Sequence, residues 1–194
     1  VTGDIAGIQI GSELTLSLNW EIRFDNMQRH CGEHILSGVL YKQFGGINKG
    51  FHMGEQYMTI DISLEQSPEV DSISWEMAKN AELWANKIIW DDESVVVKHF
   101  DQKEEAKQLP LRKELTFNEN ISIVCIGSLS NLSDCVACCG THPSTTGQVG
   151  MIKIYKVEPN KGMFRIYFEA GKRAFRHYQE NFDTLTELSN KLSA

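Results

Sequence analysis

The 194-residue chain lacks the patterns that mark several large classes of protein. No apolar run approaches the roughly 20 residues that a membrane-spanning helix needs, and no charged segment followed by an apolar one resembles a secretion signal. We find no internal repeat, no low-complexity segment and no ATP-binding motif. With 41% hydrophobic and 23% charged residues, the composition is typical of a soluble globular protein, which we expect in the cytosol.

Cysteine is scarce, and its number is odd. The five cysteines cannot all pair within one chain, so a disulfide framework is not indicated. Four of them lie within or close to a histidine motif, which fits reduced thiols that bind a metal. The remaining one, Cys125, lies in an apolar run and is interpreted as a packed thiol.

Two pairs of candidate metal ligands lie far apart in the sequence. His30 and His34 are separated by three residues, and so are Cys138 and His142. Imidazole and thiolate groups in a roughly tetrahedral array suit a borderline divalent metal, most often zinc. We therefore predict a Zn²⁺ site assembled from two separate parts of the fold. Four protein ligands are typical of a structural site, whereas a catalytic site keeps one position open, so both kinds of site stay possible.

The two pairs are expected on different kinds of structure. Asp25, with Gln28 three residues later, has the pattern of a helix start, and apolar residues follow at helical spacing. On such a helix His30 and His34 lie one turn apart on one face, so both can reach a single ion. Glycine, proline, serine and threonine in residues 138–147 predict a loop that could close over the metal from the opposite side.

These motifs resemble those of a known family. His30-x3-His34, with residues 138–142 and the Thr-x-Gln-x-Gly that follows, is similar to the editing domain of alanyl-tRNA synthetases and of the free-standing alanyl-tRNA editing proteins, the AlaX family. In that family the motifs read roughly HTxxH and CGGTH. Residues 19–28 and 50–55 resemble the long form of AlaX in particular. The same domain is the second additional domain of threonyl- and alanyl-tRNA synthetases, and the resemblance covers nearly the whole chain.

Two cysteines depart from the family pattern. Family spacing implies that Cys138 is the ligand and that Cys139 stands where glycine is usual, but two residues separate Cys139 from His142, so Cys139 stays open as the ligand. Cys31 stands where threonine is usual. Because a thiol is a poorer hydrogen-bond partner than a hydroxyl, we expect discrimination between substrates to be weaker here or to depend on another residue.

The resemblance implies an aminoacyl-tRNA deacylase that depends on zinc and removes serine, with glycine as a further candidate, from mischarged tRNA-Ala. Zinc suits the hydrolysis of an activated ester. Glu33, next to His34, is a candidate for the general base or for a group that orients a ligand. His52, expected in a turn that borders the aminoacyl pocket of the family, is a second catalytic candidate, with an exposed loop histidine as the alternative.

Two other functions stay open. The chain could be an RNA-binding module in which zinc only fixes the loop, or the editing part of an alanyl-tRNA synthetase with an ATP-dependent ligase upstream. A metal with an open coordination position would favour the hydrolase over the module.

Charge is unevenly distributed along this acidic chain of net charge −7. Residues 61–120 carry 14 acidic and 7 basic side chains, whereas residues 151–178 carry 7 basic and 2 acidic ones. Because neutralised phosphates supply much of the affinity for nucleic acid, we expect the end of the tRNA near residues 151–178. The alternative is a solvated face of a hairpin.

Periodicity predicts an α+β fold in which a mostly antiparallel sheet packs against two long helices. The expected helices are one from Asp25 to Gly45, one from Pro68 to Trp90 with Trp84 in the core, and one from Gly171. The expected strands cover residues 57–62, 94–100, 121–126, 151–157 and 163–168, the last two as a hairpin, and residues 102–108 are expected to form a charged turn or short helix.

Three parts are expected. Residues 1–20, with broken alternation around Ile5, Ile8 and Ile10, should be the remnant of a small β-barrel whose first strands are missing. Residues 21–172 should form the editing domain. Residues 173–194 should form a helix that leads to a missing further domain, through which the protein could form a homo-oligomer, because the helix carries an apolar stripe from Phe175 to Leu192.

Overall fold

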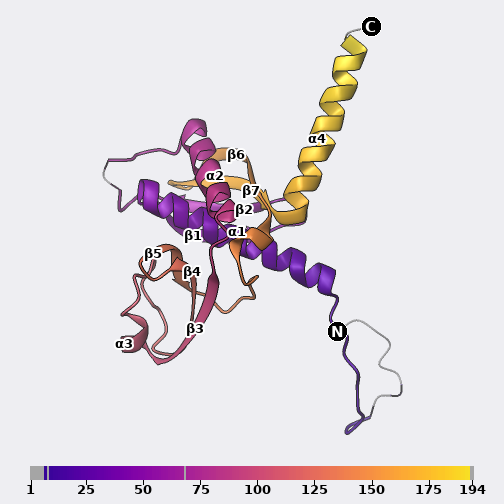
Figure 1. The fold of residues 1–194 in the computed structure, drawn as a ribbon. Helices are drawn as coiled ribbons and strands as arrows, with labels where there is room; N and C mark the ends of the chain where they lie inside the picture. The colour runs from indigo at the N-terminus through magenta and orange to yellow at the C-terminus, as the bar shows by residue number, and fades with distance from the viewer. Residues whose placement is uncertain (1–6, 8, 68, 193–194) are drawn as a thin grey trace.

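The computed structural model describes residues 7, 9–67 and 69–192 of the chain. These residues form an α+β fold with antiparallel sheets and a C-terminal helix (Figure 1), as the periodicity predicts. The elements, in chain order, are α1 (Trp20–Phe44), β1 (Ile47–Met53), β2 (Met58–Ser63), α2 (Trp75–Trp90), β3 (Val95–Gln102), α3 (Lys103–Ala106), β4 (Glu119–Ser128), β5 (Asn131–Ala137), the 3-10 turn η1 (Thr146–Val149), β6 (Ile152–Asn160), β7 (Met163–Ala170) and α4 (Gly171–Leu192).

The strands form two sheets and not the single sheet expected from the sequence. The larger sheet has the order β1-β2-β7-β6, and the smaller has the order β3-β4-β5. Two strands, β1 and β5, are not evident from the sequence. β5 contains Ser133 and Asp134, both buried, so it lacks the apolar pattern by which a strand is recognised. It pairs with β4 through a tight hairpin and forms an edge of the smaller sheet, which is separate from the larger one.

Helix α1 runs between the two sheets. It contacts β5 of the smaller sheet and β7, β1 and β2 of the larger one. Its apolar residues form the main core together with β2, β6, β7 and α2. A helix covered on two sides in this way can hold side chains toward both sheets at once, and this position makes α1 the element on which the site is built.

Helix α1 begins earlier than expected, and helix α2 begins later. α1 starts at Trp20, because Asn19 already caps it by accepting a hydrogen bond from the backbone N–H of Ile22, and Asp25 lies inside the helix. α2 starts after Ser74, which accepts from the N–H of Met77, and not at residue 68, which lies outside the described residues. The C-terminal end of α1 at Gly45, in left-handed backbone conformation, is confirmed.

The expectation that Trp84 packs in the core is wrong. This side chain is 50% exposed, and the buried face of α2 consists of Ala78, Ala81, Ala85 and Ile89. The three alanines let α2 approach α1 closely, and the large indole is displaced to the outer face.

The two ends of the chain project from the body (Figure 1). Residues 9–19 contain no strand, and Ile5 and Ile8 lie outside the described residues, so the barrel remnant stays a prediction. α4 buries only Gly171 and Ala174, and its apolar stripe from Phe175 to Leu192 is exposed. None of the described helices combines the length and the apolar content that crossing a bilayer requires.

Candidate metal centre

Four side chains from two parts of the fold converge at one point. His30 and His34 come from α1, Cys138 follows β5 directly, and His142 comes from the loop after it. Their candidate ligand atoms all lie within 4.8 Å of one another. Cys138 Sγ lies 3.5 Å from Nε2 of His30 and 3.5 Å from Nε2 of His142. Tetrahedral bonds of zinc length would separate sulfur from nitrogen by about 3.5 Å, so this group could hold an ion of that size.

The loop that carries Cys138 and His142 is held by a hydrogen bond at each end and passes close over His30. The N–H of Cys138 donates to the carbonyl of Ser122 on β4 at 3.0 Å. A Cβ on Gly140 would lie 2.1 Å from Cε1 of His30, so only glycine lets the loop pass over this ring. Farther along, Thr146 donates from Oγ1 to a carbonyl of α2 at 2.7 Å, which fixes the far end of the loop.

The geometry distinguishes the two neighbouring cysteines. The sulfur of Cys138 lies in the cluster, whereas the side chain of Cys139 is exposed. Burial opposes ionisation of the Cys138 thiol, but hydrogen bonds from His142, His30 and His34 outweigh it and lower the pKa to about 3. Cys138 is therefore present as the thiolate that a metal requires.

Asp134 and Arg112 form a second layer behind His34. Nδ1 of His34 lies 3.1 Å from Oδ2 of Asp134, and Arg112 donates from Nε to Oδ1 at 2.6 Å and from Nη2 to Oδ2 at 3.2 Å. All three are buried. Burial lowers the pKa of His34, but the hydrogen bonds with Asp134 and Cys138 raise it to about 10. With such a pKa both ring nitrogens carry protons near neutral pH, so a metal would have to displace the proton on Nε2. The carboxylate on Nδ1 orients the ring and makes Nε2 a better donor to that metal.

A cleft of about 200 Å³ opens beside the cluster. Phe51 lies in its wall with its ring parallel to that of His30, at 6.0 Å between centroids. Glu33 also lines it: Oε1 accepts from Ser37 at 2.6 Å and from Asn48 at 2.6 Å, and Oε2 lies 4.0 Å from Nε2 of His34. One oxygen of Glu33 is thus held by hydrogen bonds, while the other faces the histidine cluster.

Comparison with known proteins agrees with this geometry. The family described as threonyl and alanyl tRNA synthetase second additional domain matches residues 121–167, which include Cys138 and His142. The chain is 38% identical to alanyl-tRNA editing protein AlaX-L of Pyrococcus horikoshii over 172 residues, 88% of this chain and 40% of that protein. It is 30% identical to AlaX-M of Methanosarcina acetivorans over 173 residues, 87% of this chain and 67% of that protein.

The chain belongs to the alanyl-tRNA editing protein family. It is also 32% identical to an alanine–tRNA ligase of Pyrobaculum calidifontis over 186 residues, 93% of this chain but 20% of that enzyme. The chain thus spans less than half the length of AlaX-L and a fifth of the length of this ligase.

Two residues singled out from the family motifs lie away from the cleft. His52 is exposed on β1 and is not among the residues that line the cleft, where its neighbour Phe51 lies. Its assignment as a catalytic residue stays a prediction that this position does not support. Cys31 is fully buried in the main core, where burial, Asp134 and Glu33 raise its pKa to about 12. It therefore cannot contact a bound aminoacyl group directly.

Asp134 and Arg112 are not evident from the sequence as part of the site. Arg112 lies in the irregular segment between α3 and β4, and no local pattern connects it with His34, 78 positions earlier. The one available signal is the carboxylate of Asp134 inside the short run that leads to Cys138, where a buried charge needs a partner.

Proposed function

We propose that this protein hydrolyses the ester bond of mischarged tRNA-Ala and releases serine or glycine, with Zn²⁺ held by His30, His34, Cys138 and His142. The observation that carries the proposal is the convergence of three imidazoles and one thiolate beside a small cleft, in a chain whose relatives are named alanyl-tRNA editing proteins. When bound, zinc would polarise an ester carbonyl and favour ionisation of water.

The size of the cleft supports a small aminoacyl group. Its volume of about 200 Å³ is below the ~300–1,000 Å³ of common small-molecule sites, which suits serine and glycine. Phe51 limits one side of the cleft. Asn48 also lines the cleft, but its amide is already bonded to Glu33, Ser37 and Gly50. A different group that binds the hydroxyl of serine would be left unpaired by alanine, and this would favour serine over alanine.

Glu33 is the proposed general base. Its Oε2 faces the cluster and could take the proton of a water that attacks the ester, while Ser37 and Asn48 hold Oε1 in place. Because Oε1 is held, the carboxylate keeps one orientation with Oε2 toward the cluster. A general base needs such a fixed position to lie within reach of the proton that it accepts. The 38% identity to AlaX-L, above the 32% identity to the ligase, supports a free-standing editing protein over the editing part of a synthetase.

Deacylation of Ser-tRNA-Ala, Gly-tRNA-Ala and Ala-tRNA-Ala by the zinc-loaded protein tests the proposal. We expect release of serine or glycine and little release of alanine. Glu33→Gln should bind zinc as the parent does, by elemental analysis, but lower the rate by about 10²–10⁴-fold. Cys138→Ala should lose both zinc and activity, and Cys139→Ala, its matched control, should keep both.

Two outcomes would contradict the proposal. If the zinc-loaded protein binds tRNA but releases neither serine nor glycine, the metal only fixes the loop of an RNA-binding module. If Cys138→Ala without zinc still deacylates at the parental rate, the cluster has no part in the reaction.

A further inference from the structure

We propose that a basic pocket next to the metal cleft binds the phosphate backbone of the RNA strand whose aminoacylated end enters that cleft. The basic pocket is defined by Lys49, Lys103, Lys107, Arg112 and Lys113. The identity of the ligand as RNA rests on the proposed function, whereas the anion site itself rests on the geometry.

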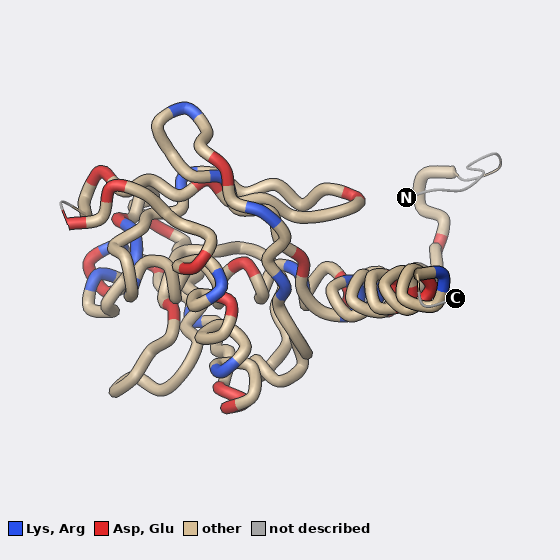
Figure 2. The backbone as a smooth tube through the Cα atoms, turned by 90° about the horizontal axis from the view of Figure 1, so that it is seen from above, with Lys and Arg blue, Asp and Glu red and all other residues tan. Residues whose placement is uncertain are grey.

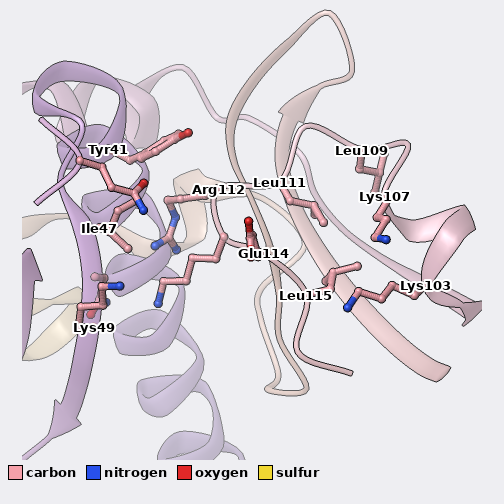
Figure 3. A pocket seen from close by; sticks show the side chains of 13 residues that line it. Tyr41, Ile47, Lys49, Lys103, Lys107, Leu109, Leu111, Arg112, Glu114 and Leu115 are labelled. Atoms are coloured by element: carbon pink, nitrogen blue, oxygen red, sulfur yellow. The ribbon is translucent and has the colours of Figure 1, made fainter. Parts of the chain in front are cut away.

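The basic pocket has a volume of about 880 Å³. In Figure 3, Lys49 extends from β1 on one side, and Lys103 and Lys107 extend from α3 and its C-terminal end on the other, with Arg112 between them. Asn48, Lys49, Arg112 and Lys113 line both this pocket and the metal cleft. The two hollows are therefore adjacent parts of one surface, and a strand in the first can continue into the second.

Three of the five cations of the basic pocket lack an acidic partner among the described residues, whereas Arg112 is paired with Asp134. Five basic side chains line it against one acidic side chain, Glu114. Within the described residues, Lys49, Lys103 and Lys113 have no carboxylate oxygen within 4.0 Å, and Lys107 has one at 3.9 Å. Burial and the neighbouring guanidinium lower the pKa of Lys113. An anion bound among these groups would relieve their mutual repulsion.

Arg112 has an unused donor at the junction of the two hollows. Its side chain is only 4% exposed, and two of its nitrogens bind Asp134. The third nitrogen, Nη1, is buried with no hydrogen-bond partner among the described residues. A buried donor without a partner is costly, and an anion that reaches the junction would satisfy it.

The basic segment of residues 151–178 is a weaker candidate than the sequence suggested. Four of its seven cations pair with carboxylates within the fold, namely Lys153 with Glu82, Lys156 with Glu158, Arg165 with Asp61 and Arg173 with Asp25. Acidic and basic residues are interspersed along the backbone in the body of the molecule (Figure 2). Lys103 and Lys113 of the basic pocket have no such pair within the described part of the chain, although both come from residues 61–120, the part of the sequence with net negative charge.

An RNA strand fits this pocket better than a free phosphate. The volume far exceeds that of one phosphate group, and Tyr41, which is 39% exposed, lies in the wall beside the lysines. Cations combined with an aromatic ring are the arrangement that binds single-stranded nucleic acid, since the ring can stack on a base while the cations follow the backbone. Continuity with the metal cleft gives the strand a direction.

Binding of uncharged RNA tests the inference without using catalysis. We would measure fluorescence anisotropy of a labelled RNA hairpin with a single-stranded 3′ end between 50 and 300 mM salt. The double variant Lys49→Ala/Lys103→Ala removes one cation from each wall. It should lower the slope of log K against log[salt] by about 1.4 and weaken binding about 25-fold at 0.1 M salt, because each contact to single-stranded RNA contributes about 0.7 to the slope.

Lys153→Ala/Lys156→Ala is the matched control. It changes the net charge equally but removes cations that are paired within the fold, so affinity and slope should stay within about twofold of the parent. Unchanged binding by the pocket variant, equal losses in both variants, or no RNA binding by the parent would overturn the inference. Inorganic phosphate at constant ionic strength should compete weakly. If millimolar phosphate displaces the RNA completely, the pocket is a free-anion site.

The outcome is independent of the proposed hydrolysis. If the pocket variant binds RNA like the parent while the protein still deacylates tRNA, the assignment of the basic pocket as the RNA site is wrong and the proposed hydrolysis is supported. If RNA binding depends on the pocket but no ester is hydrolysed, the assignment of the RNA site is supported and the proposed hydrolysis is wrong.

Discussion

Replacing Asp134 by asparagine should weaken metal binding although all four ligands remain. Asp134 is 4% exposed, and its two oxygens serve His34 at 3.1 Å and Arg112 at 2.6 and 3.2 Å. An asparagine has one oxygen for these three N–H donors. Depending on how the amide is turned, its NH₂ group faces either Nε of Arg112 or both Nη2 of Arg112 and Nδ1 of His34, so at least one buried donor loses its acceptor.

The magnitude follows from the two effects of this loss. Loss of a carboxylate behind a histidine ligand commonly costs about 10–100-fold in metal affinity, which equals about 1.4–2.8 kcal/mol. A buried donor without an acceptor costs a comparable ~1–3 kcal/mol. We therefore expect Asp134→Asn to raise the Kd for Zn²⁺ by about 10–100-fold and to lower the stability of the metal-free protein as well.

Competition with a fluorescent zinc chelator would measure the Kd, and urea denaturation of the metal-free protein would measure the stability. Asp61→Asn is the matched control, because Asp61 accepts from Arg165 on β7 at 2.8 Å through each oxygen, much as Asp134 accepts from Arg112, but contacts no candidate ligand. It should lose stability without losing zinc. Parental zinc affinity in a folded Asp134→Asn protein would refute the role given to Asp134.

Three further predictions concern stability and dynamics. Glu169→Leu should destabilise the protein by about 3–5 kcal/mol in urea denaturation. Arg29 donates to Glu169 at 2.8 Å and 2.9 Å and would be left buried without this carboxylate. The double variant Arg29→Met/Glu169→Leu should recover much of the lost stability, and no recovery would contradict the explanation. Hydrogen bonding to Arg165 lowers the pKa of Asp61, so the contribution of Asp61 to stability is present above the pKa of the unfolded chain and is lost in acid. Asp61→Asn should lower the free energy of unfolding by about 1 kcal/mol at pH 7, and the difference between parent and variant should shrink as the pH falls below about 4. A difference that does not change with pH would contradict this prediction. Residues 183–192 of α4 should exchange their amide hydrogens much faster than β7, because this half of the helix is exposed throughout, and protection equal to that of β7 would be the contrary result.

Local patterns predicted much of the fold. The hairpin of β6 and β7, the strands β3 and β4, the short helix α3 and the start of α4 at Gly171 all agree with the sequence analysis. In each case the information lies within a few residues, as at Lys161 and Gly162, whose left-handed conformations make the tight turn of the hairpin. The helix starts were misplaced where two capping residues competed, as Asn19 and Asp25 did.

In the candidate site, too, local features were predictable from the sequence and contacts between distant segments were not. Residue type and spacing were enough to predict His30, His34, Cys138 and His142, because metal ligands come in recognisable pairs, and the structure brings the four together. The partner of His34 could not be predicted, because it depends on how β5 pairs with β4 and on where the segment before β4 folds back. The location of the unpaired cations was inaccessible for the same reason: the net charge of a segment does not show which of its cations are paired.

The position of α1 between two sheets explains why so many charged groups are buried near the site. Arg29 pairs with Glu169 on β7 of the larger sheet, and His34 pairs with Asp134 on β5 of the smaller one. Each buried pair costs desolvation and adds little net stability, but a helix bound by directional contacts to sheets on two sides cannot rotate between them. Because His30 lies between these two anchors in the sequence of α1, its backbone position is constrained by contacts with both sheets. The buried charges, which add little net stability, thus help to keep the candidate ligands of α1 in place.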